Sequence, residues 1–255
     1  MTNFVGNLDW SFFINAFMRL IPLLICVTLH ELAHGYVANR LGDPTARILG
    51  RLTLNPIKHI DPVGALMILF VGFGWAKPVP VDMRNFRNPK RDMAITAVAG
   101  PLANIVLALF VLIILALIGN SLAGGNSNFP GEFFLHSIFS IAPGSISEFV
   151  YQIITRTAFL SLILAIFNLL PIPPLDGSKI LFSFFSDRLH DAVMRYERFG
   201  FVILIALLLL PNFSGFPNVL SMIVFRPAMH LISSISLFLG IIPYEVYSFI
   251  NQLEV

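Results

Sequence analysis

Charged residues are scarce in this chain of 255 residues. Asp, Glu, Lys and Arg together make up 12% of it, about half of the roughly 25% found in soluble globular domains. Hydrophobic residues make up 56%, and the mean hydropathy is +0.82. This composition excludes an ordinary soluble domain and is typical of a polytopic membrane protein, whose apolar side chains face lipid.

Cysteine is also nearly absent. Cys26 is the single one, so an intrachain disulfide is excluded. The N-terminus has neither the basic region nor the small-residue cleavage site of a secretory signal peptide. We therefore expect the first apolar run to be retained.

Long apolar runs predict an all-α polytopic membrane protein with about five to six transmembrane helices. Asp9 can cap a first helix, and Gly42 and Pro44 are typical helix stop signals. The predicted helices are residues 10–41, 93–118, 148–170, 199–210 and 219–240. We expect the whole chain, 1–255, to form a single membrane-embedded domain.

Three shorter stretches predict irregular structure beside these helices. Residues 63–73 are apolar but shorter than the roughly 17–25 residues of a span, which favours a re-entrant or peripheral helix. The alternation at 48–54 predicts a short strand or hairpin, and 72–81, rich in Gly and Pro, predicts extended chain. Non-helical backbone at membrane depth must be covered by protein or line a water-filled cavity.

The basic residues are unevenly distributed. Residues 40–91 and 177–198 hold 13 of the 16 Lys and Arg, whereas 119–147 and 211–218 hold none. Because Lys and Arg gather in cytoplasmic loops, the first pair is expected to lie inside the cell and the second pair outside. This placement also explains the cluster at 77–91 without a nucleic-acid partner.

The motif His30-Glu31-Leu32-Ala33-His34 lies within the first apolar run. On a helix His30 and His34 share one face, so both imidazoles can bind one zinc ion. Glu31 lies beside that face and can take a proton from a metal-bound water. Ionisable groups inside a membrane segment are costly and usually functional.

A third ligand has to come from elsewhere in the chain, because catalytic zinc commonly has three protein ligands and one open position. Asp176 is the best-placed membrane-proximal carboxylate, although it could also be a turn residue or a helix cap. Cys26 shares the face of His30, but a small buried apolar role is favoured for it. His59 is expected to be an exposed loop histidine.

Asn104 lies in the predicted helix 93–118, where a carboxamide needs hydrogen-bond partners. It could bridge two helices, or it could hold substrate backbone beside a zinc site. The sequence alone leaves both roles open.

Beyond the first motif, several others make the chain resemble the site-2 protease family of intramembrane zinc metalloproteases, peptidase family M50, in its short form. They are Asn55-Pro-Ile-Lys-His-Ile-Asp-Pro62, Gly74-Trp-Ala-Lys-Pro-Val-Pro80, Ala99-Gly-Pro-Leu-Ala-Asn104 and Asn168-Leu-Leu-Pro-Ile-Pro-Pro-Leu-Asp-Gly177. The core motifs span about 20–200. We expect the short form without a PDZ domain, for which the 119–147 loop has no room, and without a CBS domain.

The resemblance implies one Zn²⁺ per chain, with His30, His34 and Asp176 as ligands and Glu31 as the catalytic residue. It implies that Asn104 and Asn168 line the site and hold substrate or the oxyanion. The implied activity is hydrolysis of peptide bonds in transmembrane helices near the cytoplasmic face of the cell (inner) membrane. The partners are then a transmembrane protein or peptide substrate and the lipid bilayer.

Two alternatives belong to other classes. A zinc or proton-coupled transporter would need polar groups along a path across the bilayer, whereas the polar motifs here predict one depth. A catalytically silent membrane adaptor would not need Glu31.

Overall fold

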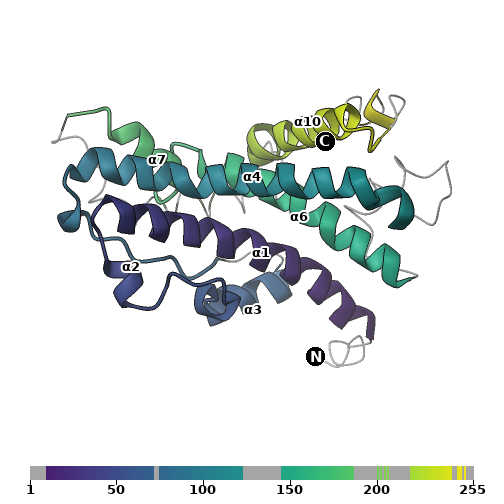
Figure 1. Cartoon of the computed structure of the whole chain (residues 1–255), viewed down its shortest axis with the longest axis horizontal. Coiled ribbons are helices and arrows are strands. Elements are labelled where there is room, and N and C mark those ends of the chain that lie inside the picture. Colours follow the sequence, from purple (N-terminus) through teal and green to yellow (C-terminus); the bar gives the residue numbers. More distant parts are fainter. Residues whose placement is uncertain are drawn as a thin grey trace.

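Three long helices form the body of the protein. The computed structural model describes residues 10–71, 75–122, 145–186, 219–242 and 246–248, with the single residues 200, 202, 204, 206 and 250. Helices α1 (Trp10–Leu41), α4 (Pro89–Leu122) and α6 (Ile146–Asn168) run along the long axis, and α4 packs against both of the others (Figure 1). The expected helices at 10–41, 93–118 and 148–170 are thereby confirmed, with α4 longer at both ends.

Shorter elements surround this bundle. Helices α2 (Thr45–Ile48) and α3 (Pro62–Val71) lie along one side of α1, and α7 (Asp176–Phe182) packs against α4 (Figure 1). Two 3₁₀ turns, η2 (Pro56–His59) and η3 (Met83–Asn85), connect them. A π-helical turn, η5 (Ser221–Phe225), leads into α10 (Arg226–Phe238), which contacts α6 and α4.

The buried apolar core lies where α4, α6 and α10 meet. Leu112 and Leu115 of α4, Tyr151 and Phe159 of α6, and Ile232 of α10 are almost fully buried there. These contacts hold α4 and α6 together over much of their length. The two packed helices α4 and α6 thereby form a rigid support for the polar motifs at one end of the bundle.

The outer face of α4 carries a long apolar stripe. Its members recur at helical spacing and are exposed: Val98, Leu102, Val106, Phe110, Ile113 and Leu117. A stripe of this size has to be covered, and lipid would cover it. Four described helices are long and apolar enough to cross a membrane, at 17–41, 89–118, 146–168 and 221–238.

We expect five to six spans from the sequence, and the described residues contain four. Of the predicted helix 199–210, residues 200, 202, 204 and 206 are described and are helical, and the rest lies outside the described residues. The predicted helix 219–240 is confirmed as η5 followed by α10. In the stretch 63–73, the described residues 63–71 belong to helix α3.

The predicted strand at 48–54 is wrong. Residues 45–48 form α2, Gly50 has φ +63°, and the Arg51 amide donates to the Ala46 carbonyl. The Asp43 carboxylate accepts hydrogen bonds from the Thr45 amide and hydroxyl, which starts the helical turn. Gly50, in the left-handed region, then turns the backbone, so the residues after it do not continue as an extended strand.

The expected extended chain at 72–81 is found over its described part, residues 75–81. Among the residues that the structure describes there are no strands, and one isolated antiparallel bridge pairs Ile60 with Ala76. Pro78 and Pro80 favour this conformation, because each disfavours the helical region for the residue before it.

Candidate metal centre

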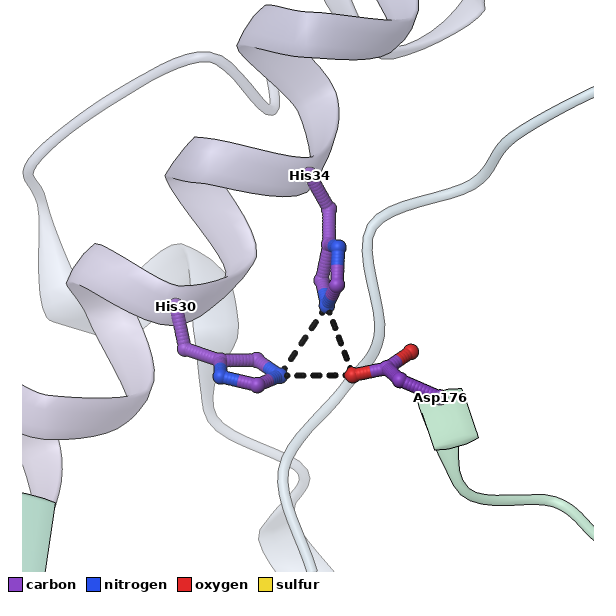
Figure 2. Close-up of side chains that lie close together, drawn as sticks. All are labelled: His30, His34 and Asp176. Carbon is purple, nitrogen blue, oxygen red and sulfur yellow. Dashed lines mark hydrogen bonds and ion pairs between the residues drawn. The ribbon is translucent and has the colours of Figure 1, made fainter. Parts of the chain in front are cut away.

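Three side chains from distant parts of the sequence converge at one buried point. His30 Nε2 lies 3.0 Å from His34 Nε2, and Asp176 Oδ2 lies 3.2 Å and 3.1 Å from these two nitrogens. Figure 2 shows the three atoms as a triangle, with the histidines from α1 and the aspartate from the start of α7. The exposed fraction of each residue is 7–8%.

The local fold explains this convergence. His30 and His34 are one helical turn apart on α1, so their rings project from the same face. Asp176 begins α7 directly after the proline-rich segment that ends α6. A Cβ at Gly177 would lie 2.5 Å from the Leu170 carbonyl oxygen, so only glycine lets α7 start this close to α6.

The spacing fits a zinc ion. A tetrahedral zinc with bonds of about 2.0–2.1 Å keeps its ligand atoms about 3.3 Å apart. The three observed distances are within a few tenths of an ångström of that value. Two imidazole nitrogens and a carboxylate oxygen are also a donor set that zinc accepts in catalytic sites.

The second nitrogen of His34 supports the same interpretation. His34 Nδ1 lies 2.7 Å from the carbonyl oxygen of Thr96 on α4, and a carbonyl can only accept. Nδ1 therefore carries the proton, which leaves the lone pair of Nε2 directed at the centre. Metal-binding histidines are commonly oriented in this way.

Asn104 has the corresponding position beside His30. Asn104 Nδ2 lies 3.2 Å from His30 Nδ1, while Asn104 Oδ1 is buried with no partner among the described residues. Interchanging the amide nitrogen and oxygen gives the buried Oδ1 a donor, since it then accepts the proton of His30 Nδ1. The Nε2 lone pairs of both histidines then face the centre, as a metal requires.

Gly100 of α4 lies directly against the two imidazoles. A Cβ there would be 2.5 Å from His34 Cε1 and 2.6 Å from His30 Cε1, far inside van der Waals contact. The glycine thus lets α4 come close enough to offer Thr96 and Asn104 to the histidines.

Asp176 directs one carboxylate oxygen, Oδ2, at the two histidine Nε2 atoms. A carboxylate binds a metal in its deprotonated form. Lys179 Nζ is 3.8 Å from Asp176 Oδ1, the oxygen that does not face the histidines. The two carboxylate oxygens are thus used separately.

Glu31 points to a different neighbour. Its Oε2 accepts a hydrogen bond of 2.6 Å from the amide of Val79, in the segment between α3 and η3. Asn168 lies at the end of α6, where its Nδ2 donates to the Leu164 carbonyl at 2.9 Å.

Two other candidate ligands lie outside the cluster. Cys26 is buried, with Sγ 3.5 Å from the Thr157 carbonyl oxygen, which agrees with the small packed role favoured for it. The expectation that His59 is exposed is wrong, since its exposed fraction is 1%. Its Nε2 bonds the Thr53 carbonyl at 2.9 Å, because the turn of η2 folds the ring under the loop before it.

The sequence reasoning overlooked three residues beside the centre: Thr96, Gly100 and Val79. Thr96 and Val79 act through backbone groups, so their contacts cannot be inferred from which amino acids they are. Gly100 did leave a signal, since small residues in membrane helices mark close helix packing.

Known proteins resemble this chain over most of its length. Residues 18–211 match the model of peptidase family M50. The "Putative zinc metalloprotease YwhC" of Bacillus subtilis (strain 168) is 38% identical over 192 residues, 75% of this chain and 80% of the relative. The "Putative zinc metalloprotease Rip2" of Mycolicibacterium smegmatis is 30% identical over 193 residues, 74% of this chain and 65% of the relative.

No solved structure matches the chain. The family match covers both motifs of the buried cluster, the histidine pair of α1 and Asp176 at the start of α7. The four apolar helices are consistent with an integral membrane protein. On this evidence the chain belongs to peptidase family M50.

Proposed function

We propose that this protein is a zinc-dependent intramembrane endopeptidase that cuts transmembrane helices of membrane proteins. The observation that carries the proposal is the buried triangle in which His30 and His34, on an apolar helix long enough to span a membrane, meet Asp176 at the start of α7. Family membership and the names of the relatives support a metalloprotease. His30, His34 and Asp176 are the proposed ligands of one zinc ion per chain.

Zinc would acidify a bound water and polarise the scissile carbonyl. Glu31 is the general base: its carboxylate accepts the proton of the attacking water. Glu31 then gives that proton to the amine that leaves. Thr96 and Asn104 hold the imidazoles of His34 and His30 in the ligand tautomer throughout.

Asn104 and Asn168 are also proposed to hold substrate or the oxyanion. Asn104 is fully buried, so contact with substrate requires a chain that reaches into the packed helices. Asn168 is only partly buried and lies closer to the surface, which makes its amide the more accessible of the two.

The active site is proposed to face the cytoplasm across the cell (inner) membrane. His34 is seven residues from the end of α1, which places it about 10 Å along the helix from that end. The basic segment 84–91 follows on the same side, and the 119–147 loop without Lys or Arg lies on the other.

Cysteine labelling tests this orientation. In a Cys26→Ala background we expect Asn88→Cys to react with a membrane-impermeant thiol reagent only from the cytoplasmic side, and Ser127→Cys only from outside. Labelling of both positions from one side would contradict the proposed topology.

A substrate helix has to unwind before it can be cut. Within a helix the scissile carbonyl accepts a hydrogen bond from an amide four residues on, and side chains shield it. The exposed segment around Lys77 and Pro78 is extended and lies beside α1. We propose that amides of an unwound substrate donate hydrogen bonds to backbone carbonyls of this extended segment.

A series of model substrates tests the need for unwinding. Replacing Gly, Pro, Ser or Asn near the scissile bond by Leu or Ala, at constant span length, should slow cleavage about 10-fold or more, because helix propensity rises by up to about 1–3 kcal/mol per site. The same replacements far from the bond are the control. Equal rates for stiff and weak helices would show that unwinding does not limit the reaction.

The transporter alternative needs polar groups along a path through the membrane. Helix α6 does bury Gln152, Thr155 and Arg156 away from the zinc triangle. Thr155 Oγ1, however, donates to the Tyr151 carbonyl at 2.9 Å, and Arg156 Nη2 lies 3.5 Å from Gln152 Oε1. These groups bond within their own helix, which favours a packing role over a transport path.

A further inference from the structure

The segment 75–82, called the strap below, passes beside α1 and is anchored through its backbone. The Lys77 amide donates to the His59 carbonyl at 2.9 Å, and Arg51 Nη2 donates to the Lys77 carbonyl at 2.8 Å. At the far end the Asp82 amide donates to Asp43 Oδ2 at 2.8 Å. The strap is therefore fixed on both sides of its centre.

At that centre lies Val79, whose amide donates to Glu31 Oε2 at 2.6 Å. This is shorter than the roughly 2.7–2.9 Å usual for a charge-assisted bond to a carboxylate. The neighbours are Pro78 and Pro80, which have no amide proton. Among these three residues Val79 thus carries the single backbone donor, and it is directed at Glu31.

Packing holds Val79 in this position. Its exposed fraction is 7%, although Lys77 and Pro78 beside it are exposed. A Cβ at Gly35 would come within 3.0 Å of Val79 Cγ1 and 2.6 Å of Leu52 Cδ2. The missing side chain at Gly35 lets the strap approach α1 one turn beyond Glu31.

We propose that the Val79 amide is a positioning group that orients the Glu31 carboxylate for its role as general base. The inference rests on the proposed function, because it presumes that Glu31 handles the proton. A glutamate has three rotatable side-chain bonds, and a general base has to be held within hydrogen-bond reach of its proton. The strap supplies that restraint through a backbone amide, so no second side chain is needed.

In this arrangement the two carboxylate oxygens of Glu31 have different roles. Oε2 accepts the hydrogen bond from Val79, and among the described residues no hydrogen bond is formed to Oε1. Oε1 is thus left for the attacking water. The bond to Oε2 also satisfies one of the lone pairs of a half-buried carboxylate, which would otherwise lose solvation.

The chain offers a matched pair of variants for the test. Val79→Pro removes the amide proton, and Val81→Pro makes the same change two residues on, where the amide has no hydrogen-bond partner among the described residues. Val79→Ala keeps the proton and shortens the side chain. All are assayed as the purified full chain with a transmembrane substrate, together with zinc content by metal analysis.

We expect Val79→Pro to lower kcat about 10- to 100-fold, the usual weight of a hydrogen bond to a charged group, with KM within about 3-fold of wild type. Zinc content should stay unchanged, since no ligand is touched. Val81→Pro should keep kcat within about 3-fold. Val79→Ala keeps the amide proton but loses packing, so its kcat should fall less than that of Val79→Pro. A backbone ester at Val79, which deletes the proton and keeps the side chain, should reproduce Val79→Pro.

A second background separates positioning from mere folding. Glu31→Asp withdraws the carboxylate from Val79 by one methylene. Adding Val79→Pro to Glu31→Asp should therefore lower kcat by less than about 3-fold. The inference would be overturned if Val79→Pro lowered kcat equally in wild type and in Glu31→Asp, or if the ester at Val79 had a normal kcat. A Glu31→Gln variant that cuts as fast as wild type would instead overturn the proposed function itself.

Discussion

Glu31→Gln should retain zinc and lose hydrolysis by about 10³-fold or more, since it removes the general base and leaves every proposed ligand in place. Glutamine has the size of glutamate and can still accept the Val79 hydrogen bond through its carbonyl oxygen. The fold and the strap should therefore be preserved. Metal analysis and cleavage of a transmembrane substrate, measured on the same preparation, check both halves of the prediction.

His34→Ala is the matched control for that result. It removes one corner of the triangle and the contact with the Thr96 carbonyl, so zinc and hydrolysis should be lost together. If Glu31→Gln turned over substrate at the wild-type rate, the role given to Glu31 would be wrong whatever the zinc content.

Gly100→Ala is the second substitution with a large expected effect. Alanine favours a helix by up to about 1 kcal/mol over glycine, so helix propensity alone predicts a more stable protein. The added methyl group would, however, lie within 2.6 Å of the His30 ring and closer still to that of His34. Both rings, or α4 itself, have to move.

We therefore expect Gly100→Ala to weaken zinc binding by about 10- to 100-fold, as displaced supports of metal-binding histidines do. Hydrolysis should fall at least as far. Val98→Ile adds one methylene at an exposed position on the same helix and should change neither quantity. A zinc titration that is the same for Gly100→Ala and wild type would show that α4 does not pack on the histidines as described.

Features encoded by neighbouring residues could be predicted from the sequence. The C-terminal end of α1 follows from Gly42 and Pro44, and the shared face of His30 and His34 follows from helical periodicity. Asp176 was available as the best-placed distal carboxylate, and the structure does bring it to the histidines.

Features that depend on distant contacts could not be predicted in this way. The bond between Glu31 and Val79 joins residues 48 apart and uses a backbone amide that every residue except proline carries. His59 was expected to be exposed because its loop is polar, yet the turn of η2 buries its ring. The strand expected at 48–54 failed because the Asp43 carboxylate starts a helix at Thr45.

The central claim is zinc-dependent hydrolysis inside the membrane, and one reconstitution tests it most directly. Purified protein in lipid vesicles is stripped of metal by a chelator, supplied again with zinc in measured amounts, and given a single-span substrate whose cut ends are identified by mass spectrometry. We predict that cleavage stops on stripping, returns with about one zinc per chain, and falls within the apolar span near its cytoplasmic end. Cleavage that survives complete removal of zinc, or that is confined to water-soluble peptides, would contradict the account.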